Sequence, residues 1–365
     1  MKSKSTSSRL FVISGPAQLL FLGTALYKHS RKALEENNDI LILRGDNVSQ
    51  KRKVITEEIA NKILNWGRII WLDNADYFKQ KDKKEFLRKI IPEWINEIWL
   101  CMPYAPVELN LQTIFYSAKV IFFDDGLGSC VRPISILDHV NKPSFIKKNL
   151  VFNLSKTMTW LRDSFLMRSK GMLSLGIKKQ YLLFSDFLKI KNKKSKNIDM
   201  DWVDLNTIVS QFNVKEEKPL LFSNDKTCLV IGQFFSNNDS ISRELELKEY
   251  LRVCEKMIDE GYDVIWKEHP KNPNPFWNDL KSVFNNKVHN LDDYYSFYWP
   301  IEILINTINV NMCISCTSTS LITINRIFGI KIMSFSPRLA SKLIGSDREV
   351  AILLSETLDK SELLF

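Results

Sequence analysis

A histidine stands at the end of an apolar run in the segment YDVIWKEHP. His269 follows Lys267 and Glu268, and Pro270 fixes the direction in which the chain leaves. In open parallel sheets, strand ends face the crevice where ligands bind. Side chains alternate along a strand, so Lys267 and His269 are expected on one side, where both can bind one anion. A structural histidine is the alternative, although it would more naturally lie within the apolar run.

Two adjacent carboxylates end another apolar run, in the segment FFDDGLGS. Asp124 and Asp125 precede two glycines that allow a sharp turn. Carboxylates this close repel each other in a partly desolvated site, so one is expected to have a raised pKa and to be able to act as a general base. Ordinary turn chemistry is the alternative for so short a motif.

Two further strand ends carry groups that suit an anion. Gly232 and Gln233 follow one strand, and a glycine there lets a backbone amide approach a phosphate or a sugar. Ser318, Thr319 and Ser320 begin a helix directly after another strand. Hydroxyls and amides at a helix N-terminus form an anion site, and capping alone would explain only one of these residues. The four strand ends together suit group transfer from a phosphorylated donor.

Short apolar, β-branched runs alternate with helical patterns in both halves of the chain, which predicts βαβ units. The predicted strands are 10–14, 39–43, 68–73, 97–100 and 119–125, then 227–233, 263–269, 310–315 and 331–335. The predicted helices are 18–36, 55–66, 83–97 and 108–118, then 244–260, 299–309 and 318–329. The expected fold class is α/β, with two Rossmann-like, doubly wound domains facing each other across a cleft. We expect a first domain at 1–150, a basic interdomain segment at 151–225 with an exposed loop at 189–197, and a second domain at 226–365.

Composition limits the class of protein. The chain has 365 residues, of which 45% are hydrophobic and 25% charged, so it is expected to be globular with room for two cores. It lacks an apolar run of the roughly 20 residues that a membrane span needs. Gly15 and Pro16 divide the apolar N-terminus, which predicts a strand, a loop and a helix rather than an export signal.

The net charge of +9 predicts an anionic partner: nucleic acid, an anionic membrane surface or a charged saccharide. The basic runs lack the aromatic interleaving and the motifs of nucleic-acid binders, so no nucleic-acid partner is expected. The segment 151–171 mixes apolar and cationic residues and can lie on an anionic membrane. An interdomain packing helix is the alternative for this segment, and a solvated face is the alternative for each basic run.

Several chemistries lack support in the sequence. Of six cysteines, Cys313 and Cys316 form one C-x-x-C pair without a second ligand pair, so reduced, buried thiols and a cytoplasmic location are expected. There is no P-loop, G-x-G-x-x-G motif or metal-ligand cluster, so no metal or cofactor is expected. His29, His139 and His289 are interpreted as structural.

The order of D-D-G, K-x-H-P and a Ser/Thr doublet resembles the signature of bacterial sialyltransferases, including lipooligosaccharide sialyltransferases and capsule polysialyltransferases. The likeness covers most of the chain, from SGPAQL through FFDDG, IGQ, WKEHP and WPIEILI to STSL. It implies a GT-B fold, CMP-sialic acid as the donor, inversion at the anomeric carbon and no metal ion.

The resemblance also implies roles for single residues. Asp124 would deprotonate the acceptor hydroxyl, with Asp125 as the second choice. His269 would assist the departing phosphate. Lys267 matches the basic position of that motif, and Glu302 matches a residue that holds the ribose.

The register of the phosphate-binding doublet is ambiguous, because it falls on Thr319 and Ser320 or on Ser318 and Thr319. The family usually shows a plainer Ser-Ser or Ser-Thr pair. Gly232, Gln233, Glu268 and Pro270 complete the expected donor-binding set.

The expected function is therefore transfer of sialic acid to a lipooligosaccharide or capsule glycan, with a glycan or glycolipid acceptor and peripheral contact with the inner membrane surface. One alternative is a GT-B enzyme that uses a UDP-sugar or CMP-Kdo. Another is a non-catalytic protein that binds glycan in an assembly complex. The acceptor, the linkage, the choice between one sugar and a polymer, and the oligomeric state stay open.

Overall fold

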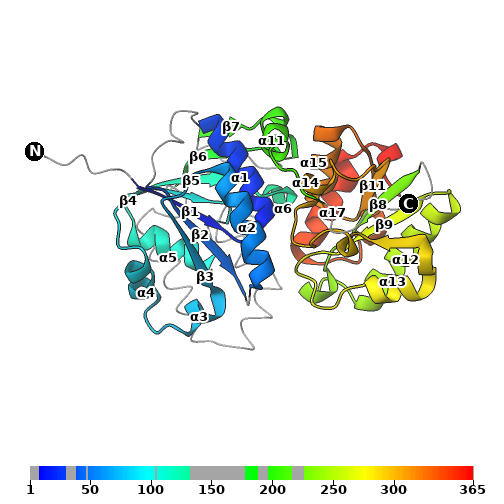
Figure 1. Ribbon diagram of the computed structural model, residues 1–365, viewed down its shortest axis with the longest axis horizontal. Helices are drawn as coiled ribbons and strands as arrows, with labels where there is room; N and C mark the ends of the chain where they lie inside the picture. The colour runs from blue at the N-terminus through cyan, green and yellow to red at the C-terminus, as the bar shows by residue number, and fades with distance from the viewer. Residues whose placement is uncertain are drawn as a thin grey trace, which may run out of the picture. The chain divides into compact units, whose positions relative to one another are not determined.

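The computed structural model describes residues 8–29, 38–46, 48–102, 105–131, 177–187, 196–215 and 226–364. The chain divides into two compact units, Met1–Ile208 and Val209–Phe365. Each unit has one sheet whose paired strands are all parallel, with helices on both faces (Figure 1). The prediction of two doubly wound α/β domains is confirmed.

The first unit contains a sheet in the order β3-β2-β1-β4-β5-β6-β7. Its strands are β1 (Ser8–Ile13), β2 (Ile40–Gly45), β3 (Arg68–Asp73), β4 (Ile95–Leu100), β5 (Lys119–Phe123), β6 (Ile177–Leu182) and β7 (Lys196–Asp199). Its helices are α1 (Pro16–His29), α2 (Gln50–Ile63), α3 (Asn74–Lys79), α4 (Lys83–Ile90), α5 (Pro106–Ile114), α6 (Leu127–Val131) and α11 (Trp202–Val209), with a 3-10 turn η2 (Ser185–Phe187).

Strand β1 is buried on both faces, as a central parallel strand must be. Leu10 and Val12 belong to the core that also contains buried side chains of α3, α4 and α5. Phe11 points the other way and contacts Trp66 and Trp99, with ring centroids 5.2 and 5.5 Å away. The continuous apolar run therefore places the residue after β1 at a fixed point on the carboxyl edge of the sheet.

The second unit contains a sheet in the order β10-β9-β8-β11-β12. Its strands are β8 (Thr227–Ile231), β9 (Asp263–Lys267), β10 (Val288–Asn290), β11 (Met312–Ser315) and β12 (Lys331–Ser334). Its helices are α12 (Arg243–Asp259), α13 (Trp277–Phe284), α14 (Ile301–Leu304), α15 (Thr319–Phe328), α16 (Ser336–Leu339) and α17 (Gly345–Thr357). Its 3-10 turns are η3 (Ser236–Asn238), η4 (Asn285–Lys287), η5 (Leu291–Asp293) and η6 (Lys360–Glu362).

Both sheets reverse their strand order at the first strand of the unit. The reversal lies between β1 and β4 in the first unit and between β8 and β11 in the second. Doubly wound sheets bind ligands outside the carboxyl ends of the strands at such a switch point. The loops after these four strands are therefore where a site is expected.

The strand predictions agree closely with the structure, but β6, β7 and β10 were not predicted. The structure places β6, β7 and α11 inside the segment 151–225, and the units divide after Ile208. The predicted interdomain segment is thus largely part of the first unit wherever it is described. Its alternation is hard to recognise because β7 is an edge strand whose residues are mostly exposed. The membrane-contact segment 151–171 lies outside the described residues.

Two predicted helices are shorter than expected. The predicted helix 83–97 ends at Ile90, two residues before Pro92, and β4 begins at Ile95. The predicted helix 299–309 reduces to α14. All six cysteines are buried, and burial raises the pKa of the Cys313 thiol. Within the described parts of the chain, we find no helix with the length and apolar character of a membrane span.

Candidate active site

The two aspartates after β5 have different surroundings. Asp124 is 1% exposed, and its Oδ2 accepts a hydrogen bond of 3.1 Å from the backbone N–H of Phe184. Its own N–H donates to the carbonyl of Tyr181 over 2.9 Å. Burial raises the pKa of Asp124 to about 8, and the charge of Asp125 adds to this less strongly. A raised pKa in the pair was predicted, but desolvation rather than repulsion is its main cause.

Asp125 is partly exposed, and it is linked to the loop after β1. Its Oδ2 accepts a hydrogen bond of 3.0 Å from Nε2 of Gln18. Oε1 of Gln18 accepts a 2.7 Å bond from the backbone N–H of Ser14. The structure thus adds Gln18 and Ser14 to the site. Their signals in the sequence are the SGPAQL segment of the family resemblance and their place where the first predicted strand leads into a helix.

In the second unit, Gly232 has a packing role that its position alone did not reveal. A Cβ on Gly232 would lie 2.8 Å from the ring of Trp266, so only glycine fits. The N–H of Gly232 donates to the carbonyl of Lys267 over 2.9 Å, and that of Gln233 donates to the hydroxyl of Tyr250 over 2.7 Å. Both amides therefore have hydrogen-bond partners inside the unit, and the expectation that a backbone amide here approaches a phosphate or a sugar stays a prediction.

Lys267 is buried at the end of β9 and forms an ion pair within its own unit. Its Nζ lies 2.8 Å from Oδ1 of Asp292 and donates to the carbonyl of Phe297 over 2.8 Å. Burial lowers the pKa of Lys267, and the neighbouring Asp292 opposes this shift. The ammonium thus fixes the segment around η5 to β9. An anion bound by both Lys267 and His269, as predicted, would therefore have to compete with Asp292 for the ammonium group of Lys267.

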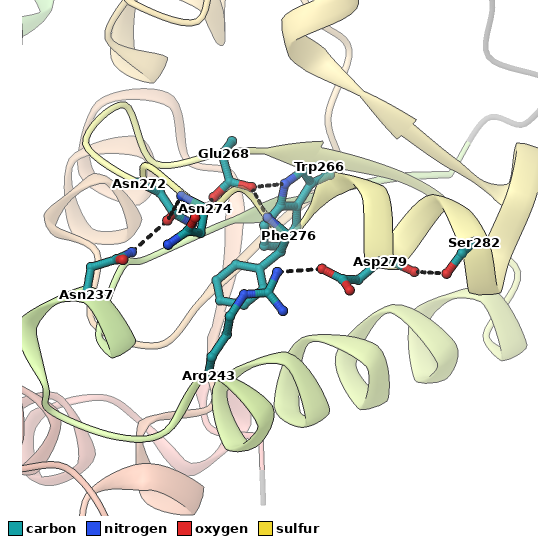
Figure 2. Close-up of polar contacts among 9 residues, drawn as sticks. All are labelled: Asn237, Arg243, Trp266, Glu268, Asn272, Asn274, Phe276, Asp279 and Ser282. Carbon is teal, nitrogen blue, oxygen red and sulfur yellow. Dashed lines mark hydrogen bonds and ion pairs between the residues drawn. The ribbon is translucent and has the colours of Figure 1, made fainter.

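Glu268 organises the loop that follows β9 (Figure 2). Its Oε2 accepts hydrogen bonds from Nε1 of Trp266 at 3.2 Å and the N–H of Phe276 at 2.7 Å. Its Oε1 accepts bonds from the N–H of His269 at 3.2 Å and from Nδ2 of Asn272 at 3.0 Å. The carboxylate therefore holds both ends of the loop that carries His269 and the exposed Pro270.

His269 has a fixed ring orientation. The ring stacks on Phe234, with centroids 4.1 Å apart, and Nδ1 accepts a 3.1 Å hydrogen bond from the N–H of Lys271. In the neutral ring the proton is therefore on Nε2. Burial lowers the pKa of His269 to about 3, with smaller effects from Lys271 and Lys267. His269 is thus a neutral hydrogen-bond donor when no anion is bound.

The helix that follows β11 begins as predicted. Ser318 caps α15, and its Oγ accepts a 3.2 Å bond from the N–H of Ser320. Thr323, one turn further along, donates to Oε1 of Glu302 over 3.0 Å. Thr319 is the first residue of the helix. The structure therefore brings Glu302 to the first turns of α15, two segments that only the resemblance had connected.

The polar groups of the second unit follow three neighbouring strands. His269 follows β9, Gln233 follows β8, and Ser318 follows β11, in the sheet order β9-β8-β11. Adjacent strands lie about 4.8 Å apart, so the ends of β9 and β11 are separated by about 10 Å, enough for a phosphate between them. We refer to Gln233, His269, Glu302 and Ser318 as the donor cluster.

The other three histidines are not members of this cluster. His29 contacts the hydroxyl of Tyr181 and the ring of Trp99, and His289 lies in β10. His139 falls outside the described residues. Among the described residues, no group of three or more His, Cys, Asp and Glu side chains is arranged to hold a metal ion.

Glu268→Gln is expected to loosen the His269 loop, because an amide NH2 would face two N–H donors. Leaving such donors unpaired costs about 1–3 kcal/mol. Hydrogen exchange should show faster exchange at the Phe276 amide, with the sheet still protected. Glu255, exposed on α12, gives a matched control as Glu255→Gln. Unchanged exchange at Phe276 would contradict the organising role of Glu268.

Comparison with known proteins decides the family. The family model described as alpha-2,8-polysialyltransferase (POLYST) matches residues 9–335. The chain belongs to this polysialyltransferase family. The match begins in β1 and ends just after β12, so it includes both aspartates and the whole donor cluster. A search of the curated proteins gave no significant match.

Two solved structures with TM-scores of at least 0.50 support the fold of this family member. The S. aureus MnaA–UDP co-structure has a TM-score of 0.51 at 8% identity, covering 96% of this chain and 87% of that one. The spinosyn rhamnosyltransferase SpnG has a TM-score of 0.50 at 10% identity, covering 95% and 89%. A sialyltransferase from Photobacterium damsela has a TM-score of 0.45 at 14% identity, covering 98% and 81%. The fold is of the GT-B type, and the polysialyltransferase family makes this protein a sialic acid glycosyltransferase.

Proposed function

We propose that this polysialyltransferase family member transfers sialic acid from CMP-sialic acid to a glycan hydroxyl, with inversion and without a metal ion. The observation that carries the proposal is the donor cluster at the switch point of the second unit. His269 and the capped N-terminus of α15 follow strands at the same edge of the sheet, and the buried Glu302 carboxylate accepts a hydrogen bond from Thr323 of α15. Helix amides and imidazole suit a phosphate, and a carboxylate suits ribose hydroxyls.

The leaving group sets what the donor cluster must do. When the bond from the anomeric carbon to the phosphate oxygen breaks, its electron pair stays on the phosphate of CMP. Nε2–H of His269 and the first amides of α15 would donate to that phosphate. An anion bound there raises the pKa of His269, so the ring can take up a proton and stabilise the added charge further. A monophosphate leaving group is thereby stabilised by the residues of this chain alone.

The acceptor needs a base on the opposite face of the sugar, and we assign this role to Asp125 rather than to Asp124. Asp125 is partly exposed, whereas Asp124 is buried and accepts a backbone hydrogen bond from the turn after β6. A base must come within hydrogen-bond reach of the hydroxyl that it deprotonates. The proton passes to the Asp125 carboxylate as the acceptor oxygen attacks the anomeric carbon.

An assay of CMP release with several sugar donors and saccharide acceptors tests this function. We expect turnover with CMP-sialic acid, an inverted linkage in the product, and no loss of rate in EDTA. Turnover with CMP-Kdo or a UDP-sugar instead would overturn the donor assignment, and inhibition by EDTA would overturn metal independence. The proposal places the reaction in the cytoplasm, with a lipooligosaccharide or capsule glycan as the acceptor.

A further inference from the structure

The loop after β8 carries two consecutive phenylalanines with different surroundings. Phe235 is 2% exposed and belongs to the hydrophobic core of the second unit. Phe234 is half-buried, and its ring stacks on the imidazole of His269, with centroids 4.1 Å apart and ring planes inclined by 28°. Phe234 therefore contacts the candidate active site, whereas its neighbour supports the core.

Helix α12 fixes the backbone on both sides of Phe234. The buried carboxylate of Glu246 accepts hydrogen bonds from the N–H groups of Phe235 at 3.2 Å and Ser236 at 2.8 Å. One helical turn later, the hydroxyl of Tyr250 accepts a bond of 2.7 Å from the amide that precedes Phe234. Residues four apart lie on one face of a helix, so a single face of α12 binds both ends of this stretch. The backbone under the Phe234 ring cannot shift without breaking these bonds.

A side-chain contact joins this loop to the loop that carries His269. Nδ2 of Asn237 donates to Oδ1 of Asn272 over 2.7 Å (Figure 2). Nδ2 of Asn272 donates in turn to Glu268, the carboxylate that organises the His269 loop. The loops after the adjacent strands β8 and β9 are therefore joined at two points, by this hydrogen bond and by the stack of Phe234 on His269.

The stack restricts a movement that hydrogen bonding leaves open to His269. The bond from Lys271 to Nδ1 fixes the tautomer, but the ring can still tilt about that bond. Contact of one ring face with Phe234 prevents the tilt, so the direction of Nε2–H is fixed. Charged groups next to this ring are Lys267, Glu268 and Lys271. Phe234 adds no charge, but an aromatic face attracts a cation, so the stack also favours the imidazolium form.

We propose that Phe234 is a positioning residue for His269, held in place by the contacts of α12 with the loop after β8. The inference rests on the proposed function, in which His269 donates to the departing phosphate. Phe234 acts through the imidazole in two ways. It aims Nε2–H, and it stabilises the protonated ring as negative charge develops on the phosphate.

Rates of Phe234→Leu in the parent and in the His269→Ala background test this role. In the parent, the substitution is expected to lower kcat about tenfold to a hundredfold, the loss that a displacement of about 1 Å can cause, with little change in KM for CMP-sialic acid. In the His269→Ala background it should cause no further loss, because the ring that it positions is absent. Phe234→Tyr keeps the aromatic face and should retain most of the parent rate. Losses that multiply in the double variant would overturn the proposal.

NMR of the His269 ring in the full chain, without turnover, separates failure of this inference from failure of the proposed function. Phe234→Leu should increase the motion of the unliganded ring and, with CMP bound, should lower the pKa of His269 relative to the parent. Phe284→Leu, half-buried on α13 in the same unit, should change neither. Unchanged ring motion in Phe234→Leu would overturn the positioning role, whatever the rate of CMP release. A parent that releases no CMP, but whose His269 ring responds to Phe234→Leu, would overturn only the proposed function.

Discussion

Asp125→Asn is expected to lower kcat by about 10²- to 10⁴-fold, the usual contribution of a general base. The side-chain amide of the asparagine cannot take the proton of the acceptor hydroxyl. Its oxygen can still accept the hydrogen bond from Gln18, so the fold should be retained. KM for CMP-sialic acid should change little, because Asp125 belongs to the first unit, whereas the donor cluster belongs to the second. Initial rates and thermal unfolding of the parent and the variant check both statements. Full turnover by a folded Asp125→Asn protein would remove the base assignment.

Asp124→Asn is the matched comparison, and it should act on stability instead. The NH2 group of the asparagine would face backbone N–H groups whose hydrogen bonds the Asp124 carboxyl accepts. This is expected to lower the free energy of unfolding by about 1–3 kcal/mol. The pH dependence has a definite sign. The folded state keeps the Asp124 proton up to about pH 8, whereas the unfolded chain releases it near the ordinary aspartate pKa of 3.8. This contribution to stability is therefore present at low pH and is lost as the pH rises through about 8.

Urea unfolding across this pH range measures the effect of Asp124. The asparagine variant should show a flatter dependence of the free energy of unfolding on pH than the parent. Catalytic rates of the folded variant should stay within a few-fold of the parent. If Asp124→Asn keeps parent stability and loses turnover, the roles of the two aspartates are reversed.

His269→Ala is expected to lower kcat by about 10²- to 10³-fold, as for removal of one donor to a developing anion. The fold should be retained, because the ring packs on the half-buried Phe234 at the edge of the core. His289→Gln, in β10, gives a histidine control outside the donor cluster. Wild-type kcat in a folded His269→Ala protein would exclude a role of this ring at the phosphate.

The titration of His269 provides a second measurement that does not depend on turnover. Without a ligand its pKa is about 3, so its NMR signals should not move between pH 8 and 5. Bound CMP carries negative charge and should raise that pKa, so the same signals should then titrate at higher pH. By linkage, CMP affinity should increase as the pH falls toward the pKa of the bound form. If the His269 signals titrate in the same way with and without CMP, the phosphate does not bind at His269.

Sequence periodicity by itself determined most of the fold and the position of the candidate site. Continuous apolar runs define parallel strands because both faces of such strands are buried, and helical patterns between them require crossovers. This was enough to place Asp124 after β5, His269 after β9 and Ser318 before α15. These positions could be predicted because each residue lies at the end of an apolar run in its own segment of the sequence.

Only the tertiary structure decided what each of these side chains does. Asp124 is buried because β6, more than 50 residues later, pairs with β5 and brings Phe184 to its carboxylate. Lys267 is paired with Asp292, and the Gly232 amide is bonded within the sheet. Burial and hydrogen-bond partners depend on segments distant in sequence, which periodicity within one segment does not encode. For the same reason, only the folded chain shows that Arg44 and Arg52 both donate hydrogen bonds to Ser14.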